Sequence, residues 1–228
     1  MPGIDVVPVG DAAAIAILGE TIDEATVRAT WQLADTVRRR MGESALDVVP
    51  AYASVLVRFD PTRVGLAQVM ACLRGAATPT ESIDGGRVRT LRVGVRFGVE
   101  FGADLDETAN EVGLTVQRYV RTFCAAEYRV AFVGFLAGFP YLLGLPPELA
   151  TPRRATPRDR VPAGSVAIAG AQCGIYPRVS PGGWRLLGTT RATVFDHTRT
   201  PPALFAPGDR VRFEVVARLD DAGAEVEA

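Results

Sequence analysis

The distribution of Gly and Pro divides this chain into two parts, and that division constrains the fold more than any other feature of the sequence. Up to residue 97, long apolar segments alternate between helical and strand periodicity. From Tyr128 to Phe213 the apolar segments are short, and Gly and Pro interrupt them repeatedly. The first pattern is typical of a mixed α/β unit, and the second of an all-β barrel or sandwich. The sequence therefore predicts an α+β chain with two domains.

The periodicity over residues 1–97 predicts a split βαβ sandwich of the ferredoxin-like kind. Its first helix should begin at Thr21, because Glu24 stands three residues later, which is the spacing of a capping box. The expected elements are a strand pair over 4–18 broken at Gly10, a helix over 21–41, a strand over 45–59, a helix over 65–76 and a last strand over 89–97.

Residues 98–219 form the predicted second domain. Two short helices, over 104–113 and 115–126, come first, and short strands with frequent turn signals follow them. Residues 220–228 have the composition of a flexible acidic tail.

Four carboxylates gather in the first of these short helices, at Asp104, Asp106, Glu107 and Glu111. Carboxylates that share a helix face can do acid/base work. No His lies near them in the sequence, so a solvated helix face is the favoured interpretation.

The ionisable residues exclude several classes of chemistry. All 25 basic residues are Arg, which removes the P-loop lysine and lysine Schiff bases. The 26 acidic residues balance them, so no basic face for nucleic acid is expected. His197 and three scattered cysteines lack the spacing of a metal site, and no metal is expected. The chain has no apolar run of membrane-spanning length, and its odd, separated cysteines favour the cytoplasm.

A first candidate segment, Gly134 to Leu142, places glycines between aromatic residues. Such glycines, Gly138 beside Phe139 among them, allow close approach of the backbone to an anion or a planar ligand. A tight apolar turn of a barrel explains the same residues equally well, and both interpretations stay open here.

A second candidate segment is the loop 151–162, which carries Arg153, Arg154, Arg158 and Arg160 among prolines. Planar guanidinium groups on a stiffened loop suit recognition of a carboxylate or phosphate. The alternatives are a solvated loop, or pairing of these arginines with the chain's own acids. We expect at least one of the four to bind an anion.

A third candidate segment, residues 161–184, holds Gln172, Tyr176 and Trp184 between glycine-rich turns. These side chains could line a pocket for a small polar ligand, and a ligand-free barrel turn accounts for them as well. Hydrolytic chemistry is disfavoured here. Ser165 is not in a nucleophile elbow, and Cys173 has no evident base.

These segments resemble the family of the 5-oxoprolinase B subunits, also called allophanate hydrolase subunit 1. The family is similar to the C/D part of carboxyltransferase domains and includes a sporulation sensor-kinase inhibitor. The segments that carry the resemblance are Gly134–Leu145, Ala150–Arg160, Val161–Pro177 and Ser180–Gly188.

The resemblance implies an N-terminal ferredoxin-like domain and a C-terminal cyclophilin-like β-barrel. It implies a partner, the C-type subunit (allophanate hydrolase subunit 2), and a third, A-type subunit. Together these proteins would use ATP, with Mg, to open 5-oxoproline to glutamate, and the isolated chain would be inactive. The resemblance assigns no catalytic residue, but it implies a substrate- or phosphate-binding pocket lined by Gly138, Phe139, Arg153, Arg154, Arg158, Gln172, Tyr176 and Trp184.

The chain departs from the family pattern at four positions. It has Phe123 in place of a usual His, Ala137 in place of Pro, Cys173 in place of Thr, and Thr189 in place of a frequent Arg. A changed substrate or a reduced activity would be the consequence if these positions lie near the pocket.

The sequence thus favours a subunit of an ATP-dependent hydrolase that acts on an amide or lactam. Two other functions stay open. One is a non-enzymatic regulator that binds and inhibits a sensor histidine kinase, and the other is a barrel that binds a metabolite for its partner.

Overall fold

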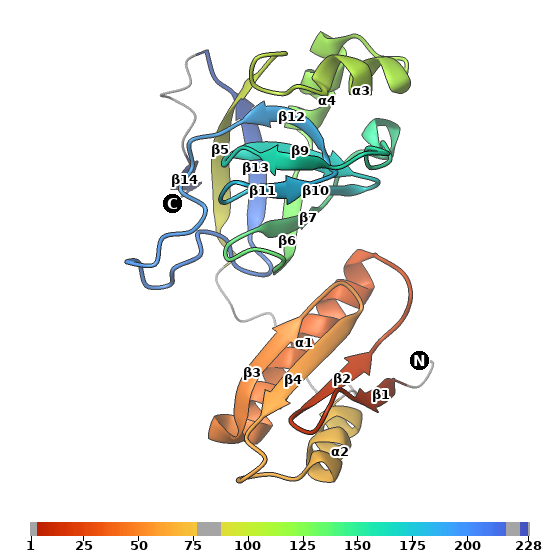
Figure 1. Cartoon of the computed structure of the whole chain (residues 1–228), viewed down its shortest axis with the longest axis vertical. Coiled ribbons are helices and arrows are strands. Elements are labelled where there is room, and N and C mark those ends of the chain that lie inside the picture. Colours follow the sequence, from red (N-terminus) through yellow and green to blue (C-terminus); the bar gives the residue numbers. More distant parts are fainter. Residues whose placement is uncertain (1–3, 77–87, 218–223, 228) are drawn as a thin grey trace. The chain divides into compact units, whose positions relative to one another are not determined.

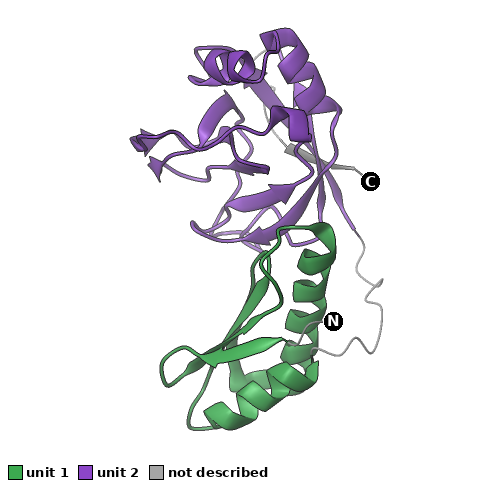
Figure 2. Cartoon of the chain, turned by 90° about the vertical axis from the view of Figure 1, so that its right-hand side faces the viewer, with its two compact units in different colours: residues 1–86 green, residues 87–228 purple. Residues whose placement is uncertain are grey.

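The computed structural model of the chain describes residues 4–76, 88–217 and 224–227 (Figure 1). The chain separates into two compact units, residues 1–86 and residues 87–228 (Figure 2). Both units mix helices with β-sheet.

The first unit is an antiparallel four-stranded sheet with two helices. The sheet has the order β1-β2-β4-β3, and the helices share one apolar core with it. The elements are β1 (Asp5–Pro8), β2 (Ala13–Ile17), α1 (Glu24–Met41), a 3-10 turn (Gly42–Ser44), β3 (Ala45–Pro50), β4 (Ser54–Phe59) and α2 (Leu66–Ala76).

The predicted stripe of α1 is confirmed, since Val27, Leu33, Ala34 and Val37 are buried. The predicted cap is wrong. The helix begins after Asp23, whose carboxylate accepts a hydrogen bond from the backbone N–H of Thr26 at 2.8 Å. The hydroxyl of Thr21 instead donates to Asp23 at 2.6 Å.

The segment predicted as one strand over 45–59 is a hairpin. The chain reverses after Pro50, where the backbone N–H of Ala51 donates to the carbonyl of Ser54 at 2.8 Å. Strands β3 and β4 then pair along their length.

The strand predicted to end the first domain belongs to the second unit. This strand, β5 (Thr90–Phe97), pairs with β12, β13 and β14, so the boundary at residue 97 is corrected to residues 86/87. In the first unit, β1 forms the edge of the sheet beside β2.

The second unit is a closed barrel of seven strands, in the order β12-β9-β10-β7-β6-β13-β5, with β14 added beside β5. Pairing of β12 with β5 closes the ring. Its remaining elements are α3 (Leu105–Glu111), α4 (Val116–Ala125), β6 (Tyr128–Val133), β7 (Pro140–Leu143), a 3-10 turn (Pro147–Leu149), β8 (Arg158–Val161), β9 (Ser165–Ala169), β10 (Gln172–Ile175), β11 (Ser180–Gly182), β12 (Arg185–Thr189), β13 (Arg210–Val215) and β14 (Ala224–Glu227).

The two short helices and most of the predicted short strands are confirmed as α3, α4 and the barrel strands. The predicted strand over 192–195 is absent from the described part of the chain, where Phe195 makes only an isolated bridge to Ala203. Within the predicted tail, residues 224–227 form β14, and the other tail residues lie outside the described ranges.

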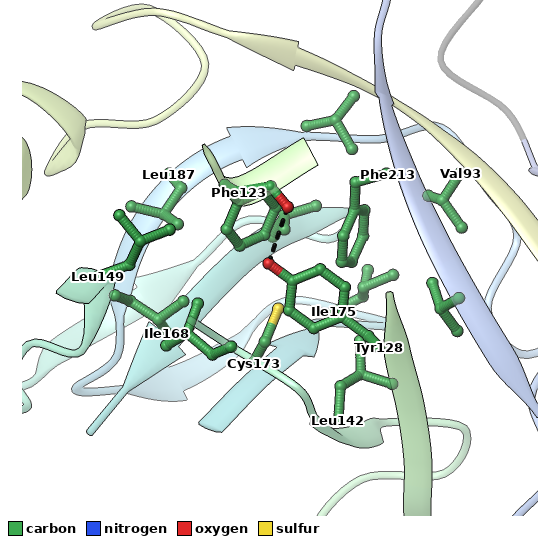
Figure 3. Packing of buried hydrophobic residues seen from close by; sticks show 14 of the residues in the cluster. Val93, Phe123, Tyr128, Leu142, Leu149, Ile168, Cys173, Ile175, Leu187 and Phe213 are labelled. Carbon is green, nitrogen blue, oxygen red and sulfur yellow. Dashed lines mark hydrogen bonds between the residues drawn. The ribbon is translucent and has the colours of Figure 1, made fainter. Parts of the chain in front are cut away.

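Aromatic and aliphatic side chains fill the barrel interior (Figure 3). The rings of Phe123 and Phe213 stack at 5.0 Å, and the Tyr128 hydroxyl donates to the carbonyl of Phe123 at 3.0 Å. Cys173 lies among them and is fully buried. None of the described helices has both the length and the apolar character needed to cross a membrane.

Candidate functional site

A buried carboxylate organises the arginine-rich loop. The Asp104 side chain is 1% exposed and precedes α3. Both of its oxygens accept from Arg158, at 2.8 Å each, and one also accepts from Arg154 at 2.7 Å. The backbone N–H of Leu186 donates to it at 2.8 Å. Asp104 therefore fastens the loop that carries the arginines to the start of β12.

The ionisation of Asp104 follows from these contacts. Burial acts to raise its pKa, but the hydrogen bonds from Arg158 and Leu186 and the charges of both arginines act more strongly. The net result is a pKa below the ordinary value for Asp, so the group is a carboxylate at neutral pH.

A second charged group lies beside the first. The guanidinium of the buried Arg185 contacts Glu107 at 2.8 Å and Glu111 at 2.9 Å, and it donates to the carbonyl of Pro152 at 3.2 Å. The four carboxylates predicted to form a solvated helix face therefore fall into two groups. Asp104, Glu107 and Glu111 pair with arginines, and Asp106 is exposed.

These contacts revise the roles of two predicted ligand-binding residues. Arg158 holds the chain's own carboxylate, Asp104, through both of its terminal nitrogens, and Arg154 holds it through Nη1, so both guanidinium groups are engaged within the protein. Pairing with the chain's own acids, the alternative left open by the sequence, is what the structure has.

An aromatic cluster forms the other half of the candidate site. Phe139 is its centre, with ring centroids of Tyr141, Tyr176 and Trp184 at 5.0, 5.2 and 5.4 Å. Phe139, Tyr176 and Trp184 are buried, while Tyr141 is partly exposed. Three of the eight residues predicted to line a pocket, Phe139, Tyr176 and Trp184, therefore pack against one another.

Two glycines permit this packing. A Cβ on Gly138 would come within 2.6 Å of the Cβ of Phe195 and 3.0 Å of the carbonyl of Val194. A Cβ on Gly182 would collide with the Tyr176 hydroxyl. Other groups do approach the backbone closely at these glycines, and they belong to Phe195, Val194 and Tyr176 of the same chain.

Of the three arginines predicted to line the pocket, Arg153 is the one that no carboxylate holds in the described ranges. Its guanidinium carbon lies 5.9 Å from the Trp184 ring, and its side chain is exposed. Burial raises the pKa of Tyr141, and the charge of Arg153 opposes that shift, which places the cation close to the partly exposed phenol. Within the described ranges, no ion pair or hydrogen bond engages the Arg153 guanidinium.

Gln172 lies at the start of β10, partly exposed, and pairs through its backbone with Ala169 of the same apolar cluster. Sequence patterns identified Asp104 as one of four grouped carboxylates, but they had no means of finding its pairing with arginines or the role of Arg185, because the partners are far along the chain. Asp104 lies 54 residues before Arg158, and Arg185 lies 74 residues after Glu111.

The described residues contain no activated nucleophile. Burial raises the pKa of Cys124 to about 12 and raises those of Cys72 and Cys173 as well, so all three are thiols at neutral pH. His197 is exposed in a turn. No group of three His, Cys, Asp or Glu side chains in the described ranges is arranged to hold a metal ion.

The departures from the family pattern lie mostly away from this site. Phe123 and Cys173 belong to the interior of the barrel, where their side chains are fully buried. The Thr189 hydroxyl donates to the carbonyl of Phe101 at 2.8 Å. Ala137 alone lies in the loop next to the aromatic cluster.

Taken together, the fold and the site define a two-unit α/β protein whose closed barrel carries an arginine–carboxylate network beside an aromatic cluster. Residues 4–205 match the family described as carboxyltransferase domain, subdomain C and D, and the chain belongs to that family.

Three similar proteins illustrate the family. The 5-oxoprolinase B subunit of Haemophilus influenzae is 37% identical over 93% of this chain and 98% of its own length. The crystal structure of TTHA0988 is 37% identical with a TM-score of 0.79, and the match covers 94% of this chain but only 40% of that one. Kluyveromyces lactis urea carboxylase has a TM-score of 0.80 over all of this chain and 24% of its own, at 19% identity, a likeness of fold alone.

Proposed function

We propose that this chain is the B-type subunit of a 5-oxoprolinase-like amidohydrolase, which opens a lactam or cleaves an amide together with a C-type subunit. The similarity to a 5-oxoprolinase B subunit over nearly its whole length supports this proposal. We further propose that the first unit is ferredoxin-like and the barrel cyclophilin-like. The three free cysteines fit a cytoplasmic protein.

One observation carries the need for a partner: apart from Arg153, the charged groups of the candidate site are already paired with one another. Asp104 holds Arg154 and Arg158, while Arg185 holds two glutamates. In the described residues no nucleophile lies beside a base, so the reacting groups must come in part from another protein of the complex. TTHA0988 supports this arrangement, because that polypeptide extends well beyond the part this chain matches.

Arg153 is the residue that we propose for substrate recognition. A lactam such as 5-oxoproline has a planar amide and carries a carboxylate. An exposed guanidinium can hold that carboxylate through two charge-assisted hydrogen bonds, while the partly exposed Tyr141 offers a flat apolar surface. Arg153 would then orient the ring, and the attack on the amide would involve groups of the partner.

ATP with Mg is proposed as the cofactor of the assembled enzyme. Amide resonance makes a lactam a poor electrophile, and phosphoryl transfer from ATP would activate it. We do not place the phosphate site at the arginine network, because Asp104 engages both terminal nitrogens of Arg158 and one of Arg154. We therefore propose that another protein of the complex holds the phosphates.

Co-expression with the C-type and A-type subunits of the same genome tests the proposal. The complex should form, and it should release glutamate and ADP from 5-oxoproline and ATP, while the chain alone should release neither. A folded three-protein complex without turnover of 5-oxoproline would refute the substrate, and turnover by the isolated chain would refute the need for a partner.

A further inference from the structure

The loop between β6 and β7 holds an exposed aromatic residue in an unfavourable backbone conformation. Phe135 has φ of +65°, the only positive value at a non-glycine residue in the described ranges, and its side chain is 64% exposed. The backbone N–H of Leu136 donates to the carbonyl of Gly134 at 2.7 Å, so these residues form a γ-turn of the strained, positive-φ type.

The surrounding loop fixes this turn firmly. The backbone N–H of Gly134 donates to the carbonyl of Phe139 at 3.1 Å, and that of Phe139 donates to Leu136 at 3.0 Å. Gly138 lies against Phe195, as its close approach shows. The loop thus joins two adjacent barrel strands and is braced at both ends, which fixes the backbone that carries Phe135.

The backbone conformation of Phe135 is costly for the isolated chain. A non-glycine residue in the left-handed region costs about 1–2 kcal/mol, which a glycine there would avoid. The ring makes an edge contact with Phe139 at 5.7 Å, but most of its surface faces solvent. Strain at an exposed aromatic side chain is a feature of binding sites rather than of cores.

The character of the loop indicates what covers the ring. No charged residue occurs from Val133 to Leu143, and Phe195 is a second exposed aromatic side chain against the same loop. Exposed apolar surface of this kind marks a protein interface, and aromatic anchors dominate the energy of such interfaces. In TTHA0988 a further stretch of polypeptide is joined to the part that this chain matches, and we take a protein of that kind as the neighbour of the loop.

From the γ-turn at Phe135 we propose that this loop is the docking point of the C-type subunit, with the Phe135 ring inserted into an apolar cavity of that partner. This inference rests on the proposed function, since it assumes that partner. Through Phe139, which contacts both Phe135 and Trp184, the interface is continuous with the aromatic cluster and Arg153. Docking there would bring the partner's groups to the candidate site.

Two substitutions of Phe135 separate the effect of losing its ring from the effect of its backbone strain. Phe135→Gly removes the ring and suits the backbone, whereas Phe135→Ala removes the ring and keeps the strain. The affinity of the full chain for the purified C-type subunit of the same genome is measured by biolayer interferometry, and thermal melting is recorded for each variant. Val99→Ala, at another exposed apolar position, is the matched control.

Both variants should bind the C-type subunit at least about tenfold more weakly than the wild type, because the anchor is lost. Phe135→Gly should melt about 2–4 °C above Phe135→Ala, because only glycine relieves the strain. The control should match the wild type in both measurements.

Each other outcome is decisive. If the wild type binds the C-type subunit and Phe135→Gly binds within twofold of it, the docking point is wrong while the proposed function stands. If the wild type does not bind the C-type subunit at all, both proposals fall. Equal melting of the Gly and Ala variants would remove the strain argument, and with it the inference.

Discussion

Among single residues, Asp104 bears most directly on the proposed site, because it pairs with two of the three arginines that were predicted to line it. Its buried carboxylate receives four side-chain and backbone hydrogen bonds, and these engage Arg154 and Arg158. The side chains of Arg154 and Arg158 are 30% and 23% exposed, so both keep some contact with water. Arg153, which directly precedes Arg154, is the arginine that we propose for recognition.

Asp104→Ala should lower the free energy of unfolding of the second unit by about 3 kcal/mol, because two guanidinium groups and one backbone N–H lose their buried acceptor. Chemical denaturation at pH 7 measures this change. Asp106→Ala, two residues away and exposed, is the control and should change the free energy by less than about 0.5 kcal/mol. Equal small effects of the two variants would contradict the structural role.

The ionisation of Asp104 also predicts a pH dependence. The pKa of Asp104 is lower in the folded than in the unfolded chain, so the folded state holds fewer protons on this group. Its stabilising contribution is complete above the unfolded pKa, about 4, and is lost as the pH falls through the lower folded pKa. The difference in unfolding free energy between wild type and Asp104→Asn should therefore shrink below about pH 4. A constant difference from pH 7 to pH 3 would contradict this.

Some residue-level features were predictable from the sequence and others were not. The grouping of arginines and of aromatics was visible, because each group lies within a short segment. The contacts of these groups were not visible. Arg158 is paired because of a carboxylate 54 residues earlier in the sequence. Trp184 is covered because Phe139, from another part of the barrel, packs against it. Local sequence specifies what a segment contains, and long-range packing specifies what it faces.

At the level of elements, the misplacement of β5 has the same physical origin. Alternating apolar residues identify a strand and its buried face, but they carry no information about its neighbour. Strand β5 pairs in parallel with β13, and its start at Thr90 faces Arg210. Two strands so far apart in the sequence leave no local signal of their pairing. A hairpin such as β9–β10 does leave one, because Gly170 marks its turn.

The packing of β12 against residues 98–104 makes an element-level prediction. A Cβ on Gly102 would collide with the carbonyl group of Leu187, which belongs to β12. Because the colliding atoms are backbone, Gly102→Ala must displace β12 or the segment that ends at Asp104. We expect a loss of at least about 2 kcal/mol in the free energy of unfolding.

The control for this prediction is Gly183→Ala, because a Cβ there would make an ordinary contact at 3.6 Å with Pro157. Its free energy of unfolding should stay within about 0.5–1 kcal/mol of the wild type. If Gly102→Ala were as stable as Gly183→Ala, the described packing of β12 would be incorrect.

For the whole molecule, the two units have different relations to function. All the predicted site residues lie in the second unit, together with the loop that bears Phe135. Fold class and the division into two parts were accessible from the sequence, because the density of Gly and Pro reports strand length directly. The site was accessible only in part, since its main feature is that most of its charged and aromatic groups satisfy one another.

The central claim is that Arg153 recognises the substrate while its neighbour Arg154 holds the fold. The KM for 5-oxoproline of the assembled complex, measured with Arg153→Ala and Arg154→Ala alongside their melting temperatures, tests it directly. Arg153→Ala should raise KM by about tenfold or more without a change in melting temperature, and Arg154→Ala should lower the melting temperature by about 3 °C or more. A wild-type KM in the Arg153→Ala complex would contradict the claim.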